Sequence, residues 1–161
     1  MLKKFLPFLL KIFPSETVFA HCDIPCGIYD PHIAQMAAHT VIRMTSLIND
    51  LTGSSPKDIH QICRLTQIKE EHAELIKREV RIIWGDYFKE DHLKDYPNLH
   101  VNVFKIMKLA SKVRQEINIE AANDLLAKVQ DFAEIFYKTK GFEIVRIPSG
   151  YPTGGEIVSH K

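Results

Sequence analysis

The chain has 161 residues, of which 45% are hydrophobic and 25% are charged, and its formal net charge is +1. This length suits one domain with a sizeable core, and this composition is typical of a globular protein rather than a disordered or membrane-embedded chain. The near-neutral charge argues against a nucleic-acid binder, which normally carries a concentrated basic surface. Three cysteines in a helical-looking chain argue against a disulfide framework.

Residues 1–20, MLKKFLPFLLKIFPSETVFA, are expected to be a leader that is removed on maturation. A basic start and a short apolar run precede the small residue Ala20, and this pattern suits cleavage directly before His21 by a processing protease. Lys11 and Pro14 interrupt the apolar run, which is too short to span a membrane and makes a poor export signal. We therefore predict a cytoplasmic protein without stable membrane association. Export through the leader, or an amphipathic arm that stays attached, are the alternatives.

The next stretch, HCDIPCGIYDP (21–31), concentrates side chains that bind metals. Three residues separate Cys22 from Cys26, which is not the spacing of a thioredoxin-like redox pair. No second cysteine pair follows in the sequence to complete a structural zinc site. From the spacing alone, a metal site and a disulfide between these two cysteines are both open.

Hydrophobic periodicity after this stretch predicts four amphipathic helices. Asp30 before Pro31 is a good start for the first helix, and Ser55 before Pro56 is a good start for the second. The expected helices span 31–51, 56–84, 99–117 and 118–140, with a longer polar and aromatic connection over 85–98. Four such helices with mostly short connections predict an all-α protein, an antiparallel four-helix bundle. Residues 141–161 are expected to form a C-terminal tail, with a short strand over 142–147.

The expected core follows from the apolar stripe of each helix. In the second helix, Cys63 is expected to act as a small core residue, and His72 interrupts an otherwise apolar face. The third helix is expected to point Ile117 inward. The stripe of the first helix consists of Ile33, Met36, Ala37, Thr40, Met44, Leu47, Ile48 and Leu51.

The chemistry of the cysteine stretch becomes specific if the chain starts at His21. The free amine, the Cys22 amide nitrogen and the Cys22 thiolate can then chelate one ion, and Cys26 returns as a second thiolate. Pro25 and Gly27 suit that tight return. A planar set of two nitrogen and two sulfur donors favours nickel(II) or copper(II) over zinc, and reduction of copper(II) by thiolates favours nickel. An axial imidazole would stabilise nickel(III), so this hook predicts a one-electron redox centre.

The stretch HCDIPCGIYDP resembles the nickel hook of nickel-containing superoxide dismutases. IKEEHAEL (68–75) and IIWGDYFK (82–89) also resemble the second helix and the following loop of that family. The resemblance covers residues 21–140, the predicted domain that joins the hook to the helices. It implies a four-helix bundle that assembles as a homohexamer with one nickel ion per subunit. It also implies an antioxidant enzyme that converts superoxide to oxygen and hydrogen peroxide by cycling nickel between the divalent and trivalent states.

The resemblance assigns the metal ligands. His21 would contribute its amine and, in the oxidised state, its imidazole. Cys22 would contribute its thiolate and amide nitrogen, and Cys26 would contribute the second thiolate. Because a leader turns the amine into a peptide nitrogen, removal of residues 1–20 would be an activation step.

The resemblance also assigns residues around the metal. Asp23, Pro25 and Tyr29 match residues that shape and shield the hook. Tyr87 matches a second tyrosine near the substrate channel, and the tyrosine hydroxyls or ordered water would relay protons. Lys89 matches a basic residue that could attract the anionic substrate.

Two positions depart from the family pattern. Where the family often has a glutamate and an arginine that hold the hook imidazole, this chain has Ala37 and His72. His72 could still hydrogen-bond the His21 imidazole, but the carboxylate is missing, and such partners tune a metal ligand. A rival interpretation is therefore a nickel or copper carrier or sensor that keeps the hook without turnover. A third is a helical structural protein with a disulfide between Cys22 and Cys26.

The free-amine hypothesis predicts that one extra residue before His21 abolishes superoxide turnover, because the added peptide bond removes a nitrogen donor. Circular dichroism should show unchanged helix content. The control is the chain processed directly before His21. Turnover retained by the extended chain would refute the hypothesis.

Overall fold

The computed structural model describes residues 26–161, so the predicted leader and the hook residues His21, Cys22, Asp23 and Pro25 lie outside the described residues. The helices are α2 (His32–Asn49), α3 (Pro56–Ile82), the π-helical turn η1 (Ile83–Tyr87), α4 (Glu90–Asp95), α5 (Leu99–Gln115) and α6 (Ile119–Thr139). The strands are β1 (Ile144–Pro148) and β2 (Glu156–His160).

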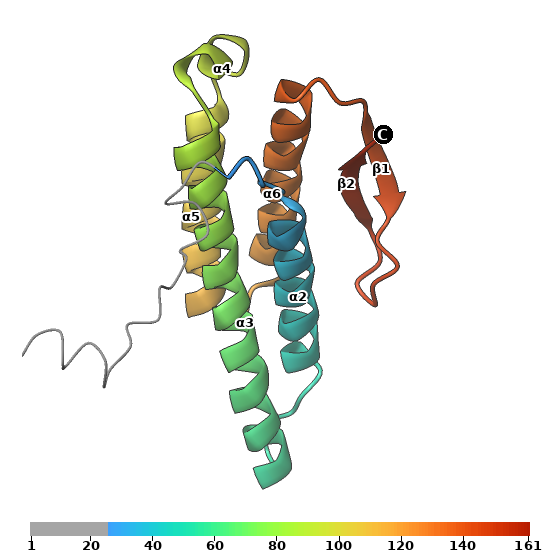
Figure 1. Ribbon diagram of the computed structural model, residues 1–161. Coiled ribbons are helices and arrows are strands. Elements are labelled where there is room, and N and C mark those ends of the chain that lie inside the picture. The colour runs from blue at the N-terminus through green and yellow to red at the C-terminus, as the bar shows by residue number, and fades with distance from the viewer. Residues whose placement is uncertain (1–25) are drawn as a thin grey trace, which may run out of the picture.

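The four long helices α2, α3, α5 and α6 form a bundle in which successive members run in opposite directions (Figure 1). Helix α2 packs against α3 and α6, and α5 packs against the same two helices from the other side. The predicted antiparallel four-helix bundle is therefore confirmed. Among residues 26–161, no helix is long and apolar enough to cross a membrane.

Side-chain caps explain where the helices begin. The Asp58 backbone N–H donates to Ser55 Oγ over 3.1 Å at the start of α3. At the start of α6, the Ala121 N–H donates to Asn118 Oδ1 over 2.8 Å. At the start of α2, the His32 N–H donates to Asp30 Oδ1 over 2.7 Å. These side chains satisfy N–H groups that have no partner in the first helical turn.

The core differs from the sequence prediction at three places. The buried face of α2 is centred on the alanines at 34, 37 and 38, whereas Ile33 and Met36 are 44% and 42% exposed. Small side chains let α2 approach its neighbours closely, and a stripe drawn through the largest apolar residues misses that face. Cys63 is exposed and is not a core residue. Ile117 is 53% exposed because α5 ends at Gln115 before it.

Residues 141–161 form a hairpin that packs on the bundle. Strands β1 and β2 pair antiparallel, with Ile144 opposite His160 and Pro148 opposite Glu156. The predicted strand over 142–147 corresponds to β1, and the sequence analysis missed β2. Val158 in β2 is fully buried against the core.

One buried cation joins two helices and the turn that follows one of them. The Lys69 side chain of α3 is 1% exposed, and its ammonium donates to the carbonyls of Val113, Arg114 and Glu116. These carbonyls lie at the end of α5, where backbone acceptors lack helical partners and the helix dipole favours positive charge. Burial lowers the pKa of Lys69. Sequence analysis missed this contact because a helical lysine usually faces solvent.

Replacing Lys69 by methionine should destabilise the protein by about 3 kcal/mol, because three carbonyls lose a buried donor. The measurement is the free energy of unfolding by chemical denaturation. Lys57→Met, an exposed lysine of the same helix, is the matched control. An equal effect of the two substitutions would contradict this role.

Candidate metal centre

The described part of the predicted hook runs from Cys26 to Asp30 and leads into α2. Cys26 is a free, exposed thiol, and the Ile28 N–H donates to its sulfur over 3.4 Å. The thiolate is the form of cysteine that binds metals. Gly27 has a φ of 71°, a left-handed conformation that favours glycine and turns the chain immediately after the cysteine.

The donor chemistry fits nickel. Cys26 is an accessible soft donor, and the other predicted donors, His21 and Cys22, precede it closely in the sequence. Thiolates and nitrogen donors are ligands that nickel accepts readily. Among residues 26–161, no cluster of three or more histidine, cysteine or acidic side chains could hold a metal ion. The positions of His21, Cys22, Asp23 and Pro25 stay predictions.

The structure brings the two predicted tyrosines together. The ring centroids of Tyr29 and Tyr87 are 5.8 Å apart. Tyr87 ends η1, and the extra residue of a π-helical turn changes the direction in which the following side chains point. Such turns occur often at functional sites. Two side chains separated by more than fifty positions in the sequence thus share one end of the bundle.

The hydroxyl of Tyr87 has a defined hydrogen-bond direction. It lies 2.9 Å from Thr139 Oγ1, and the Thr139 hydroxyl donates its single proton to the Phe136 carbonyl over 2.7 Å. Thr139 therefore accepts, and Tyr87 donates. The Tyr87 oxygen keeps lone pairs that can accept a hydrogen bond from water or a protonated product.

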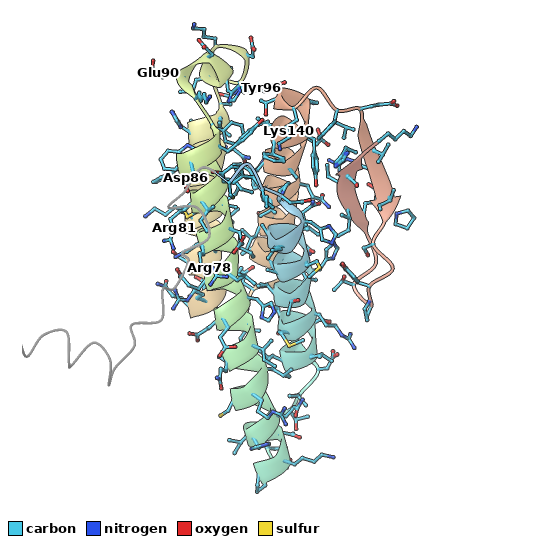
Figure 2. The ribbon with its side chains drawn as sticks, viewed as in Figure 1. Arg78, Arg81, Asp86, Glu90, Tyr96 and Lys140 are labelled. Atoms are coloured by element: carbon cyan, nitrogen blue, oxygen red, sulfur yellow. The ribbon has the colours of Figure 1, made fainter. Side chains whose placement is uncertain are left out.

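A cation that the sequence analysis missed lies over this aromatic cluster. Lys140 Nζ is 5.4 Å from the Tyr87 ring centroid and 5.1 Å from that of Phe136. Lys140 directly follows α6 (Figure 2). The predicted steering residue Lys89 is exposed, at the start of α4. Lys140 lies 53 positions after Tyr87 in the sequence, so only the fold could reveal this proximity.

The structure describes both departures from the family pattern, Ala37 in α2 and His72 in α3. Ala37 is buried in α2 and offers no polar side-chain atom. His72 Nδ1 lies 2.8 Å from the Ile68 carbonyl, which can only accept, so Nδ1 carries the proton. In the neutral ring, Nε2 is then an acceptor. His72 is about 22 Å from Tyr87 along the helix axis, so the structure does not bring it to the tyrosine pair. Its predicted bond to His21 stays a prediction.

A buried tyrosine anchors the base of the hook. The Tyr137 hydroxyl donates to Asp30 Oδ1 over 3.1 Å, on the carboxylate that also caps α2. Burial is the main cause that raises the pKa of Tyr137, and the neighbouring Asp30 charge raises it further. The phenol therefore stays protonated and acts as a permanent donor to Asp30.

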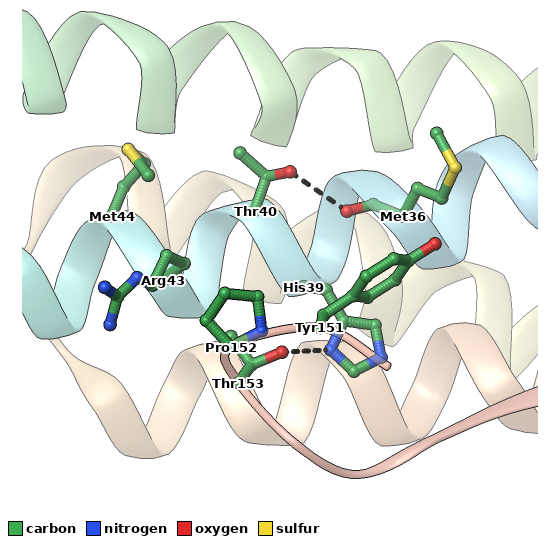
Figure 3. Close-up of a pocket in the computed structure, with 8 residues that line it drawn as sticks. All are labelled: Met36, His39, Thr40, Arg43, Met44, Tyr151, Pro152 and Thr153. Atoms are coloured by element: carbon green, nitrogen blue, oxygen red, sulfur yellow. Dashed lines mark hydrogen bonds between the residues drawn. The ribbon is translucent and has the colours of Figure 1, made fainter. Parts of the chain in front are cut away.

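An apolar hollow at the hairpin is separate from these residues. It has a volume of about 260 Å³ and lies between α2 and the loop of the hairpin (Figure 3). Its lining residues are Met36, His39, Thr40, Arg43, Met44, Tyr151, Pro152 and Thr153. None of the predicted site residues contributes to it.

Comparison with known proteins gives one consistent family. Residues 16–140 match the sequence profile described as nickel-containing superoxide dismutase. The chain is 36% identical over 135 residues to "Superoxide dismutase [Ni]" of Streptomyces seoulensis, a match that covers 82% of this chain and 98% of the relative. It is 37% identical over 133 residues to the protein of the same name from Streptomyces coelicolor, with the same two coverages of 82% and 98%.

Solved structures agree with the sequence relatives. A native nickel superoxide dismutase structure superposes with a TM-score of 0.68 at 35% identity, covering 74% of this chain and 99% of that one. A structure of nickel-containing superoxide dismutase with nickel ligation of the oxidised state has a TM-score of 0.66 at 34% identity, with coverages of 75% and 99%.

The raised pKa of Tyr137 predicts the outcome of a tyrosine titration. An ordinary tyrosine has a pKa near 10 and is mostly ionised at pH 11. Tyr137 should stay protonated there, so Tyr137→Phe and the parent chain should show equal tyrosinate absorbance at 295 nm in the folded state. In denaturant, where burial is lost, the substitution should remove one phenolate's absorbance. Loss of that absorbance already in the folded state would contradict the assignment.

Proposed function

Because the chain belongs to the nickel-containing superoxide dismutase family, we propose that its nickel centre is the N-terminal hook of a processed chain that begins at His21. His21 contributes its amine and imidazole, Cys22 its thiolate and amide nitrogen, and Cys26 the second thiolate. One nickel ion is held per subunit. The observation that carries this proposal is the exposed, free thiol of Cys26 on the segment that leads to the Tyr29–Tyr87 pair.

The reaction converts two superoxide anions and two protons to oxygen and hydrogen peroxide. When bound, nickel supplies the one-electron steps by alternating between the divalent and trivalent states. The protein must therefore attract an anion, deliver protons and exclude competing ligands.

The residues around the tyrosine pair suit those tasks. We propose that Tyr29 and Tyr87 hold water and relay protons, with the Tyr87 oxygen as an acceptor because its proton is committed to Thr139. Asp23 and Pro25 shape the hook. Lys140, and Lys89 at the outer edge, attract superoxide by steering.

Assembly and processing form a further part of the proposal. The family resemblance supports a homohexamer and a protease that removes residues 1–20 as a leader. We place the mature enzyme, residues 21–161, in the cytoplasm. Native mass spectrometry of the processed protein tests the oligomer, and a mass six times that of the subunit is expected; a stable monomer would contradict it.

One observation favours the carrier or sensor as a second candidate. Ala37 offers no polar atom, and His72 commits Nδ1 to the backbone of its own helix. If the His21 imidazole lacks hydrogen-bond partners at these two positions, the hook could bind nickel without efficient turnover.

Co-expression with nickel and the processing protease separates these functions. Intact mass, nickel content and superoxide decay are measured on the purified protein. Loss of residues 1–20, about one nickel per subunit and fast decay are expected, and Cys26→Ser should lose the nickel. Cys63→Ser, on an exposed thiol outside the hook, is the matched control. Stoichiometric nickel without turnover would favour the carrier, and a mass two protons light without metal would indicate the disulfide.

Steering by Lys140 predicts a salt-dependent effect. Lys140→Met should lower kcat/KM for superoxide about threefold at low ionic strength, because a cation near the site raises the local anion concentration. The difference should fade at about 1 M salt, where the screening length is about 3 Å. Lys57→Met removes the same charge from the start of α3 and should have no effect. An unchanged rate in Lys140→Met would contradict steering by this residue.

A further inference from the structure

The C-terminal hairpin lies beyond the part of the chain that matches the family. The matching profile ends at residue 140, and β1 begins at Ile144. The hairpin flanks α6 and α2, and β2 contacts both of these helices (Figure 1). Its buried side chains, Ile157 and Val158, are 3% and 0% exposed. The hairpin is therefore an integral layer of this protein.

Buried polar side chains of the bundle bind the backbone of β2. Gln35, fully buried, accepts from the Val158 N–H over 2.8 Å and donates to the Val158 carbonyl over 2.9 Å. Its amide thus takes the place of a neighbouring strand. Gln130 Nε2 donates to the Glu156 carbonyl over 2.7 Å. A buried amide that lost these partners would be costly, so the contacts fix the hairpin on the bundle.

The His39 imidazole adds a third fixed contact. Its Nε2 donates to the Glu156 carbonyl over 3.3 Å, since a carbonyl can only accept. In the neutral ring, Nδ1 then accepts from the Thr153 hydroxyl over 2.8 Å. Burial lowers the pKa of His39, which favours this neutral form. The loop and the second strand are both attached to α2.

A chain of contacts continues from the hairpin to the base of the hook. The His160 ring in β2 stacks on the Phe142 ring, with their centroids 4.3 Å apart. It also contacts the Tyr137 ring, with a centroid distance of 4.8 Å. Tyr137 is 3% exposed, and its hydroxyl donates to Asp30. Asp30 is four positions after Cys26 in the sequence. His160, Tyr137 and Asp30 therefore connect the hairpin to the segment that carries the predicted nickel ligand Cys26.

We infer that the hairpin positions the hook by holding Tyr137 in the orientation in which its hydroxyl fixes Asp30. The inference rests on the proposed hook. Two donors on one carboxylate oxygen, the Tyr137 hydroxyl and the His32 N–H, restrict where the hook joins α2. A metal site needs its ligands held within about 0.5 Å, so this junction bears directly on nickel retention and electronic structure.

Tyr137→Phe tests the hydroxyl, and His160→Ala tests the hairpin contact. In nickel-free processed protein, amide exchange at His32 should accelerate about tenfold in Tyr137→Phe, the factor expected for one lost hydrogen bond. In nickel-loaded protein, nickel release to a chelator should be faster and the paramagnetic resonance spectrum of the oxidised metal should change. His160→Ala should shift the same quantities in the same direction.

Tyr151→Phe is the matched control, because Tyr151 is a hairpin tyrosine that contacts His39 and not Asp30. It should leave exchange, nickel release and spectrum unchanged. Unchanged values in Tyr137→Phe would overturn the inference. An effect of Tyr137→Phe without one of His160→Ala would show that Tyr137 acts without the hairpin, which also overturns it. If the parent chain bound no nickel, the proposed hook would fail, and the exchange data would still decide whether the hairpin holds Asp30.

Discussion

The carboxylate of Asp30 connects the predicted nickel hook to the folded part of the protein. It accepts the His32 N–H at the start of α2 and the Tyr137 hydroxyl from α6. Both donors belong to rigid helices, so the segment that carries Cys26 leaves the bundle from a fixed point. Tyr137 is 3% exposed, and burial raises the pKa of its phenol.

Buried polar contacts hold the hairpin that supports this junction, and another one joins two helices of the bundle. Gln35, Gln130 and His39 hold the hairpin against α2 and α6, and the hairpin closes over Tyr137. Lys69 joins the end of α5 to α3. Each of these four side chains is a buried polar group that hydrogen-bonds to backbone atoms. Such bonds constrain direction, which apolar packing alone does not do.

The sequence predicted the bundle well because helical periodicity is a local signal. Asp30 and Ser55 also marked helix starts by local chemistry. The prediction failed where partners are distant in the sequence. Strand β2 has only five residues, and the backbone of Val158 is bound by Gln35, which lies in a helix 123 positions away.

Charged residues show the same limit in the site. Lys69 caps the end of α5, and Lys140 lies over the ring of Tyr87. The sequence around each of them does not distinguish it from an ordinary surface lysine. The ligands His21, Cys22 and Cys26 could be proposed from sequence because the chelate is built within six consecutive residues. Tyr29 and Tyr87 needed the family resemblance, and the fold then placed their rings 5.8 Å apart.

The central claim is that nickel binds at a processed N-terminus through nitrogen and both hook thiolates. X-ray absorption at the nickel edge of the processed, nickel-loaded protein tests it most directly. The account predicts sulfur scatterers from Cys22 and Cys26 together with nitrogen, and no bound nickel in Cys26→Ser. A spectrum with only nitrogen and oxygen neighbours, or one identical in the unprocessed chain, would contradict it.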